Sequence, residues 1–270
     1  MEPERLYPPE FYTEGADYTG FAARRVISIL LELLTPRSVV DVGCGTGVWL
    51  AQFALFGVSD IWGVDGPHVR ADELVIDPAR FSSADLEQPL QVGREFDCAV
   101  SLEVAEHLSP VAAEPFVDSL TRLAPVVLFS AAIPFQGGIH HVNEQWQQYW
   151  ANLFASRGYI PIDAIRPRLW DDERVLWYTR QNTLLYVRRD HLVAHPRLKE
   201  EYHRTRDNLL SIVLPNYYLR AADPRFRGLR EVAALLPQVF AAAVKRRWDR
   251  LRGDPPDRKQ VGWSTDCRRS

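Results

Sequence analysis

Two carboxylates and an imidazole occur close together in the segment Glu103-Val104-Ala105-Glu106-His107. Side chains at positions i, i+3 and i+4 of a helix share one face, so a helical turn here would bring Glu103, Glu106 and His107 together. Two carboxylates and an imidazole suit an octahedral Mg²⁺ or Mn²⁺ ion, and the lack of thiolate argues against structural zinc. The alternative is that Glu106 and His107 cap or salt-bridge a short helix.

Two adjacent histidines, His140 and His141, form a second polar cluster later in the chain. They follow the apolar segment 126–131 and a glycine-containing loop, where core packing does not explain a pair of histidines. If the predicted strands at 96–102 and 126–131 flank the same site, the two clusters meet in space. A histidine within hydrogen-bond reach of a hydroxyl could act as general base. We predict that His140 is this base, although the two histidines could exchange roles.

A glycine-spaced turn follows an apolar stretch that ends near Asp41 and includes Gly43, Gly45 and Gly47. Alternate glycines allow the backbone to pass close to a ligand. The pattern D-x-G-x-G-x-G differs from the G-x-G-x-x-G turn of dinucleotide-binding folds. A second acidic residue, Asp65, ends the next predicted strand, where α/β folds that bind nucleosides present a carboxylate to the ribose hydroxyls.

Helices and strands must position these residues. Along the chain, segments with the hydrophobic period of a strand alternate with segments that have the period of a helix. Strands are predicted near 38–42, 61–64, 80–84, 96–102, 126–131, 159–165 and 182–188. Helices are predicted near 17–34, 46–56, 111–123 and 143–157. This order predicts an α/β protein with an open, doubly wound, seven-stranded sheet that ends in an antiparallel pair of strands. Ligands of such a sheet bind at the carboxyl ends of its strands.

The composition changes near residue 190, which predicts a domain over 1–190, with an N-terminal arm, and a helical C-terminal extension over 191–270. Helices are expected at about 197–213 and 228–251, and the tail from residue 253 is polar. The second helix ends in a basic cluster: Lys245, Arg246, Arg247, Arg250 and Arg252. These cations either complement the helix dipole in solvent or bind an anionic partner such as lipid.

Composition restricts the class of protein. The 270 residues are 46% hydrophobic and 25% charged, as in ordinary globular proteins. A net charge of −3 argues against a broad nucleic-acid-binding face. The chain shows no signal peptide and no apolar run long enough to span a membrane. Its three cysteines are scattered, as expected in a reducing cytoplasm, where we place the protein.

Together the motifs VDVGCGTG, FSSADL and the strand ending in Asp65 resemble class I S-adenosylmethionine-dependent methyltransferases. The resemblance implies a Rossmann-like fold that binds S-adenosylmethionine, with Asp65 at the ribose and Asp85 at the adenine amino group. The cofactor-binding residues that it implies are Asp41, Gly43, Cys44, Gly45, Asp65, Gly66, Asp85, Leu86 and Leu102.

The E-x-x-E-H motif with a later histidine is similar to two methyltransferase groups that share a divalent-ion site. These are the small-RNA 3′-terminal 2′-O-methyltransferases and the ubiquinone-pathway O-methyltransferases. The resemblance implies that Glu103, Glu106 and His107 are ligands and that His141 is the distant histidine ligand. The separation between His107 and His141 is shorter than expected for the RNA enzymes. Residues 11–190, through EVAEHL, FSAAIPFQGG and HHVNEQWQQYW, resemble bacterial sugar O-methyltransferases of the mycobacterial methylmannose-polysaccharide type.

A cation beside the methyl donor suits a hydroxyl acceptor, because the ion lowers the pKa of a bound hydroxyl and can chelate two adjacent oxygens. We therefore predict a metal-dependent O-methyltransferase that acts on a sugar or oligosaccharide. The alternative is an O-methyltransferase of a small phenol, catechol or quinone precursor, which would use the same ion. A cofactor-binding protein without catalysis would not need the intact acidic and histidine set, and no basic face supports RNA methylation.

Aromatic residues are the predicted contacts of the acceptor, since exposed rings beside carboxylates suit stacking on sugars. The candidates are Trp146, Tyr149, Trp170 and Tyr178. The alternative for Trp146, Tyr149 and Trp150, which share one helix face, is packing against the sheet. A homodimer is compatible with the sequence.

Overall fold

A computed structural model describes residues 16–222, 225 and 228–252 of the chain. The predicted N-terminal arm at 1–15 and the polar tail at 253–270 lie outside the described residues. The chain divides into two compact units, Met1–Leu214 and Pro215–Ser270, which are described separately below. The division falls later than the predicted boundary at residue 190, because the helix that starts at Pro196 buries Leu198 in the core of the first unit.

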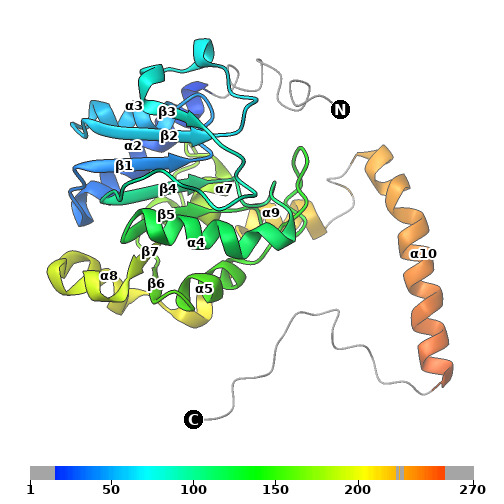
Figure 1. The fold of residues 1–270 in the computed structure, drawn as a ribbon. Coiled ribbons are helices and arrows are strands. Elements are labelled where there is room, and N and C mark those ends of the chain that lie inside the picture. Colours follow the sequence, from blue (N-terminus) through cyan, green and yellow to red (C-terminus); the bar gives the residue numbers. More distant parts are fainter. Residues whose placement is uncertain (1–15, 223–224, 226–227, 253–270) are drawn as a thin grey trace. The chain divides into compact units, whose positions relative to one another are not determined.

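One mixed sheet of seven strands, in the order β3-β2-β1-β4-β5-β7-β6, forms the centre of the first unit (Figure 1). Its strands are β1 (Ser38–Val42), β2 (Asp60–Asp65), β3 (Phe81–Ser83), β4 (Cys98–Leu102), β5 (Val126–Ser130), β6 (Tyr159–Ile162) and β7 (Leu184–Arg188). The strands β1 to β5 pair in parallel, whereas β7 runs antiparallel to both β5 and β6. This confirms the predicted doubly wound α/β fold with a closing antiparallel pair.

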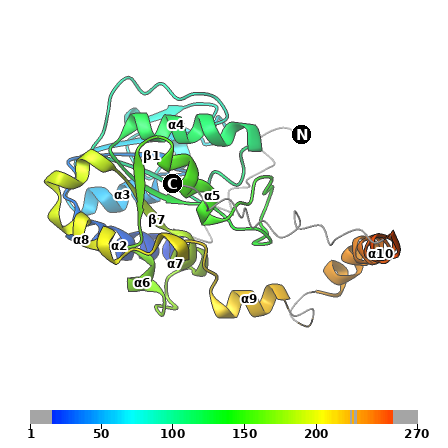
Figure 2. The same cartoon turned by 90° about the horizontal axis from the view of Figure 1, so that it is seen from below.

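Helices cover both faces of this sheet (Figures 1 and 2). The helices of the first unit are α2 (Ala16–Leu33), α3 (Val48–Leu55), α4 (Ala113–Leu123), α5 (Gln147–Ala155), α6 (Arg166–Leu169), α7 (Trp177–Asn182) and α8 (Pro196–Arg204). On one face, α2, α3 and α8 pack on the strands, and on the other face α4 and α5 do so. A strand that is covered on both sides has no polar face, which explains the fully buried sequence Val-Val-Leu-Phe-Ser of β5.

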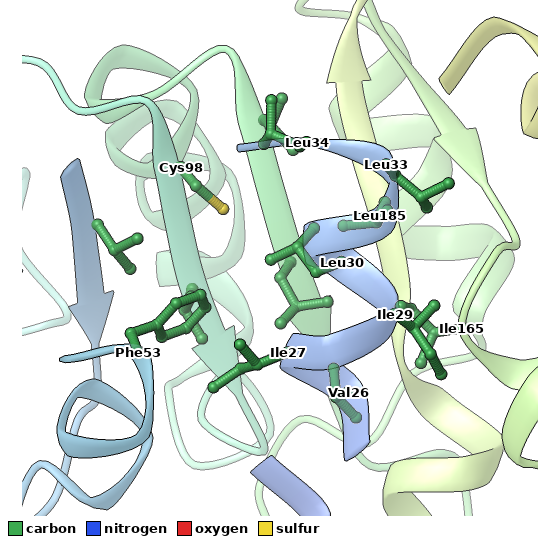
Figure 3. Close-up of a cluster of buried hydrophobic side chains, with 14 of the residues drawn as sticks. Val26, Ile27, Ile29, Leu30, Leu33, Leu34, Phe53, Cys98, Ile165 and Leu185 are labelled. Carbon is green, nitrogen blue, oxygen red and sulfur yellow. The ribbon is translucent and has the colours of Figure 1, made fainter. Parts of the chain in front are cut away.

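The first of two hydrophobic cores includes the buried face of α2, whose apolar residues recur at helical spacing (Figure 3). Val26, Ile27 and Leu30 are fully buried against side chains from the strands, and Phe53 of α3 joins them. The second core lies between the opposite face of the sheet and helices α4 and α5, where Trp150 is 1% exposed. These two cores fix the strands whose carboxyl ends carry the candidate site.

Two predicted helices differ from the structure, and two short helices of the first unit were not predicted. The helix expected at 143–157 begins only at Gln147, because the backbone amides of Val142 and Asn143 donate to the carbonyl of Glu106 and hold the chain extended. The helix expected at 197–213 ends at Arg204 in α8, and a single 3₁₀ turn follows at 207–209. The short helices α6 and α7 were not predicted, and they lie in the connection between β6 and β7.

The second unit contains α9 (Pro215–Ala222) and α10 (Leu229–Arg252), where a helix was predicted at 228–251. Lys245 and Arg247 of its basic cluster are exposed, as either interpretation of that cluster requires. No helix among the described residues is both long and apolar enough to cross a membrane.

Candidate active site

The loop between β1 and α3 needs glycine for two separate reasons. Gly43, Gly45 and Gly47 all adopt positive φ angles, at 82°, 52° and 85°, a region that glycine enters without steric cost. A Cβ atom at Gly43 would also overlap the side chain of Val104, lying only 2.8 Å from its Cγ1. The backbone of the loop therefore passes directly against the segment that follows β4.

Asp65, at the carboxyl end of β2, fixes this loop. Its Oδ2 accepts the backbone N–H of Gly45 at 2.6 Å, and its Oδ1 accepts that of Gly66 at the same distance. Burial raises the pKa of Asp65, while the two backbone amides and His68 oppose that rise. Burial also raises the pKa of Asp41 well above its ordinary value, and the nearby Asp65 carboxylate adds to this effect.

A cavity of about 760 Å³ opens above this loop at the carboxyl ends of the strands. Of the predicted cofactor-binding residues, those that line the cavity are Gly43, Cys44, Gly45, Asp65, Gly66, Asp85, Leu86 and Leu102. Asp41 is the exception: it is 3% exposed and is not among the lining residues. Thr19, Trp49 and His68 also line the cavity, although none of the three was predicted to do so.

The segment from Glu103 to Leu108 is a turn and not the predicted helix. Glu103 has a φ of 54°, an unusual value for a residue other than glycine. The N–H of His107 donates to the carbonyl of Val104, which closes the turn. The side chains of Glu106 and His107 still place ligand atoms near each other, but this turn brings them together and not the spacing of a helix.

Glu106 is a completely buried acid whose two carboxylate oxygens accept no hydrogen bond from the described residues. Burial raises its pKa well above the ordinary value and repulsion from Glu103 adds to this effect, whereas the nearby backbone amides of Glu106 and Ala132 oppose the rise. An ionised carboxylate without a partner is costly in a protein interior. The site therefore favours either a proton or a cation on Glu106.

Two histidines lie beside this acid. One ligand atom from each of Glu106, His107 and His141 can be chosen so that all three lie within 4.8 Å of one another. The rings of His107 and His141 pack edge to face, with their centroids 4.8 Å apart. Burial lowers the pKa of His107 to about 4, so its imidazole is neutral at physiological pH and able to coordinate a metal.

Glu103 is not one of this group of three, but it interacts electrostatically with Glu106 and His141 and it lines the cavity. Its carboxylate accepts hydrogen bonds from Gln136 at 2.8 Å and from Asn182 at 3.2 Å. The side chain of Asn182 also donates to Gln136, so the two amides form one unit with the acid. Burial raises the pKa of Glu103, whereas these amides oppose the rise.

Gln136 and Asn182 were not predicted as partners of Glu103. Asn182 ends α7 and comes from a part of the chain remote from Glu103 in sequence. The only signal was the polar run Gln181-Asn182-Thr183 directly before an apolar strand, all three of which are buried.

His140 and His141 differ in their surroundings. His141 is half-buried and its Nδ1 lies 3.0 Å from Oε1 of Glu144, whereas His140 is exposed and has a φ of 57°. Only His141 belongs to the group with Glu106 and His107.

The predicted aromatic contacts separate into two sets. Tyr178 lines the cavity, and its pKa is raised to about 12, first by burial and then by the Glu103 carboxylate. Trp146, Tyr149 and Trp170 are not among the lining residues. Tyr149 packs edge to face on the core residue Trp150, which fits the core-packing alternative for that helix face.

Solved structures of known proteins share this fold. The sugar N-methyltransferase KedS8 of Streptoalloteichus sp. ATCC 53650 is 18% identical, with a TM-score of 0.51, over 67% of this chain and 92% of that chain. DesVI of Streptomyces venezuelae is 15% identical, with a TM-score of 0.51, over 69% of this chain and 98% of that chain. No curated protein matches the sequence significantly.

The two structures are too distant in sequence to assign the chain to a family, but a family model does assign it. The model described as a methyltransferase domain matches residues 16–175, which is more than half of the chain and includes the glycine loop, the turn after β4 and both histidines. The chain therefore belongs to this family of methyltransferase domains.

Proposed function

We propose that the protein transfers a methyl group from S-adenosylmethionine to a hydroxyl of a sugar or oligosaccharide, with the help of a divalent cation. The observation that carries the proposal is the buried, unpartnered carboxylate of Glu106 beside two imidazoles, next to a cavity with the residues expected around the cofactor. Family membership supports the methyl transfer. The cation and the class of acceptor are the parts that need experiment.

Cofactor binding is assigned to the glycine loop and the acid after β2. The loop carries no side chain at Gly43 and Gly45, so that the methionine part of the cofactor can approach the backbone. Asp65 accepts two backbone N–H groups, and its carboxylate has lone pairs left for the ribose hydroxyls. Asp85 is exposed at the cavity edge, where it would meet the adenine.

The residues around Glu106 fit a cation by their chemistry. Glu106 offers charge that no hydrogen bond neutralises, and His107 and His141 offer imidazole nitrogens. Glu103 keeps free lone pairs beyond its two amide contacts, so it remains a candidate for a fourth ligand. A bound Mg²⁺ or Mn²⁺ ion would lower the pKa of a coordinated hydroxyl and orient it toward the methyl donor.

A carbohydrate acceptor fits the polar groups on the cavity wall. Tyr178 and Glu103 lie near each other there, which combines an aromatic ring with a hydrogen-bond acceptor. The exposed position of His140 would allow it to contact the acceptor and accept the hydroxyl proton. The neutral hydroxyl is a poor nucleophile, so removal of this proton is the step for which the protein must provide a base.

The experiment that tests the cation is methyl transfer after exhaustive chelation, followed by addition of Mg²⁺, Mn²⁺ or Ca²⁺. Labelled S-adenosylmethionine is offered with a panel of sugars, amino sugars, catechols and RNA. We expect transfer to a sugar hydroxyl that stops in chelator and returns with Mg²⁺ or Mn²⁺. Full turnover in chelator would exclude the metal, and transfer only to amino sugars or catechols would replace the proposed acceptor.

Asp65→Ala is expected to weaken S-adenosylmethionine binding by about 1–3 kcal/mol, through the loss of hydrogen bonds to a charged group. Part of the effect comes from the loop, since the variant also frees the amides of Gly45 and Gly66. Titration calorimetry measures the affinity. The control is Asp72→Ala, which removes an exposed carboxylate that binds Arg70 on the surface. Equal affinity of wild type and Asp65→Ala would remove Asp65 from the cofactor site.

A further inference from the structure

We propose that Glu144 is a positioning residue that sets the tautomer and orientation of His141, so that the Nε2 atom of this histidine is available to the cation. The inference rests on the proposed function, because it concerns a histidine that we assign to the cation site. It goes beyond that function by giving a role to a carboxylate outside the group of candidate ligands.

Glu144 makes three contacts with a single loop. Its Oε2 accepts the backbone N–H of Phe135 at 2.7 Å, and its Oε1 accepts that of Gly137 at 2.7 Å. The same Oε1 lies 3.0 Å from Nδ1 of His141. One side chain thus holds both the start of the loop after β5 and the imidazole at its end.

The loop requires the restraint of these hydrogen bonds because its backbone is strained. Phe135 and His140 have φ angles of 69° and 57°, which residues other than glycine rarely adopt. Residues in this region carry a conformational cost and persist only where their surroundings hold them. The bonds from Phe135 and Gly137 to Glu144 supply part of that restraint.

The ring of His141 is confined from a second side by Gly138. A Cβ atom at this glycine would overlap the ring, and the ring atoms nearest to it would be Nε2 and Cε1. The ring therefore packs directly on the backbone of Gly138 while its Nδ1 faces Glu144. The orientation of the ring therefore depends on the loop that Glu144 holds by hydrogen bonds.

The chemistry of the contact fixes the proton on His141. Both oxygens of Glu144 already accept backbone N–H groups, as an ionised carboxylate does. An ionised carboxylate cannot donate, so the 3.0 Å contact requires that Nδ1 carry the hydrogen. In the tautomer that carries this hydrogen, the lone pair is on Nε2. Histidines that bind metals commonly use one nitrogen for the ion while the other donates to such a carboxylate.

The test uses full-length protein labelled with ¹⁵N in histidine, with the His141 signals assigned through His141→Gln. In metal-free wild type, we expect the ring nitrogens of His141 to show the tautomer protonated on Nδ1. In Glu144→Gln the side-chain amide can donate, so the signals should move toward the tautomer protonated on Nε2. Titration with Mn²⁺, followed by electron paramagnetic resonance, should show an affinity lower by roughly 10–100-fold.

The control is Glu200→Gln, which changes an exposed glutamate of α8 and should leave both readouts unchanged. A wild-type His141 protonated on Nε2 overturns the inference, and this measurement needs no variant that might misfold. Unchanged tautomer and Mn²⁺ affinity in Glu144→Gln overturn it as well. If wild type takes up no Mn²⁺, the proposed cation site fails, while the tautomer in wild type and Glu144→Gln still decides the role of Glu144.

Discussion

Glu106→Gln is expected to lower methyl transfer by more than about 100-fold, and at the same time to stabilise the metal-free protein. Residues that only support a metal ligand typically contribute about 10–100-fold to affinity or activity, so the loss of a ligand should cost at least as much. Glu106 is the one candidate ligand whose two oxygens have no hydrogen-bond partner among the described residues that surround it. Its charge has no hydrogen-bond partner in the fold, which is why we propose that it binds the cation.

The effect on stability follows from the raised pKa of Glu106. Burial and Glu103 place this pKa well above the ordinary value of 4.5, so the folded state holds the proton more tightly than the unfolded state does. This contribution to stability is fully present below the unfolded pKa and is lost as the pH rises through the folded pKa. Glutamine does not titrate, so between the unfolded and the folded pKa of Glu106 the variant Glu106→Gln should lose less stability than wild type does.

Thermal unfolding of the metal-free proteins across pH measures this difference. At alkaline pH, we expect the free energy of unfolding of Glu106→Gln to be about 1–3 kcal/mol larger than that of wild type, which is the cost of a buried polar group without a partner. In acid, this difference should disappear. Addition of Mn²⁺ should stabilise wild type and leave the variant unchanged. Glu200→Gln, on the surface, should follow wild type throughout. A variant that binds Mn²⁺ normally would contradict the assignment of Glu106.

The sheet could be predicted from the sequence because its strands depend on local patterns. The apolar run before Asp41, the glycines after it and the next apolar run to Asp65 are contiguous signals, and each matches a strand or loop of the structure. The positions of the predicted cofactor residues follow from the same patterns, since a residue at a strand's carboxyl end is placed by the strand itself. All of them except Asp41 line one cavity.

The geometry of the candidate site depends on contacts between distant segments, which local patterns do not contain. Helical spacing was the wrong basis for grouping Glu103 with Glu106, because Glu103 adopts a positive φ and the amides of Gln136 and Asn182 hold its carboxylate. The late start of α5 has the same origin, since the carbonyl of Glu106 accepts the amides that would otherwise begin the helix. Both differences result from tertiary hydrogen bonds that override local propensity.

His140→Ala is expected to lower turnover by about two to four orders of magnitude, which is the usual contribution of a general base. Binding of S-adenosylmethionine and Mn²⁺ should remain, because His140 neither lines the cofactor cavity nor belongs to the group of three candidate ligands. The positive φ of His140 complicates this variant, since alanine disfavours such a backbone. His140→Asn is therefore the better variant, because asparagine tolerates this conformation and provides no base.

The acceptor found in the panel is used to measure turnover across pH for wild type and both variants. Both variants should turn over about two to four orders of magnitude more slowly than wild type at the pH where the wild-type rate is greatest. Val142→Ala is the matched control, since Val142 is an exposed neighbour at the end of the same loop and has no titrating group. A metal-bound hydroxyl could instead lose its proton directly to water. In that case His140→Asn would stay nearly as active as wild type, and the base would have to be sought elsewhere, first at Glu103 on the cavity wall.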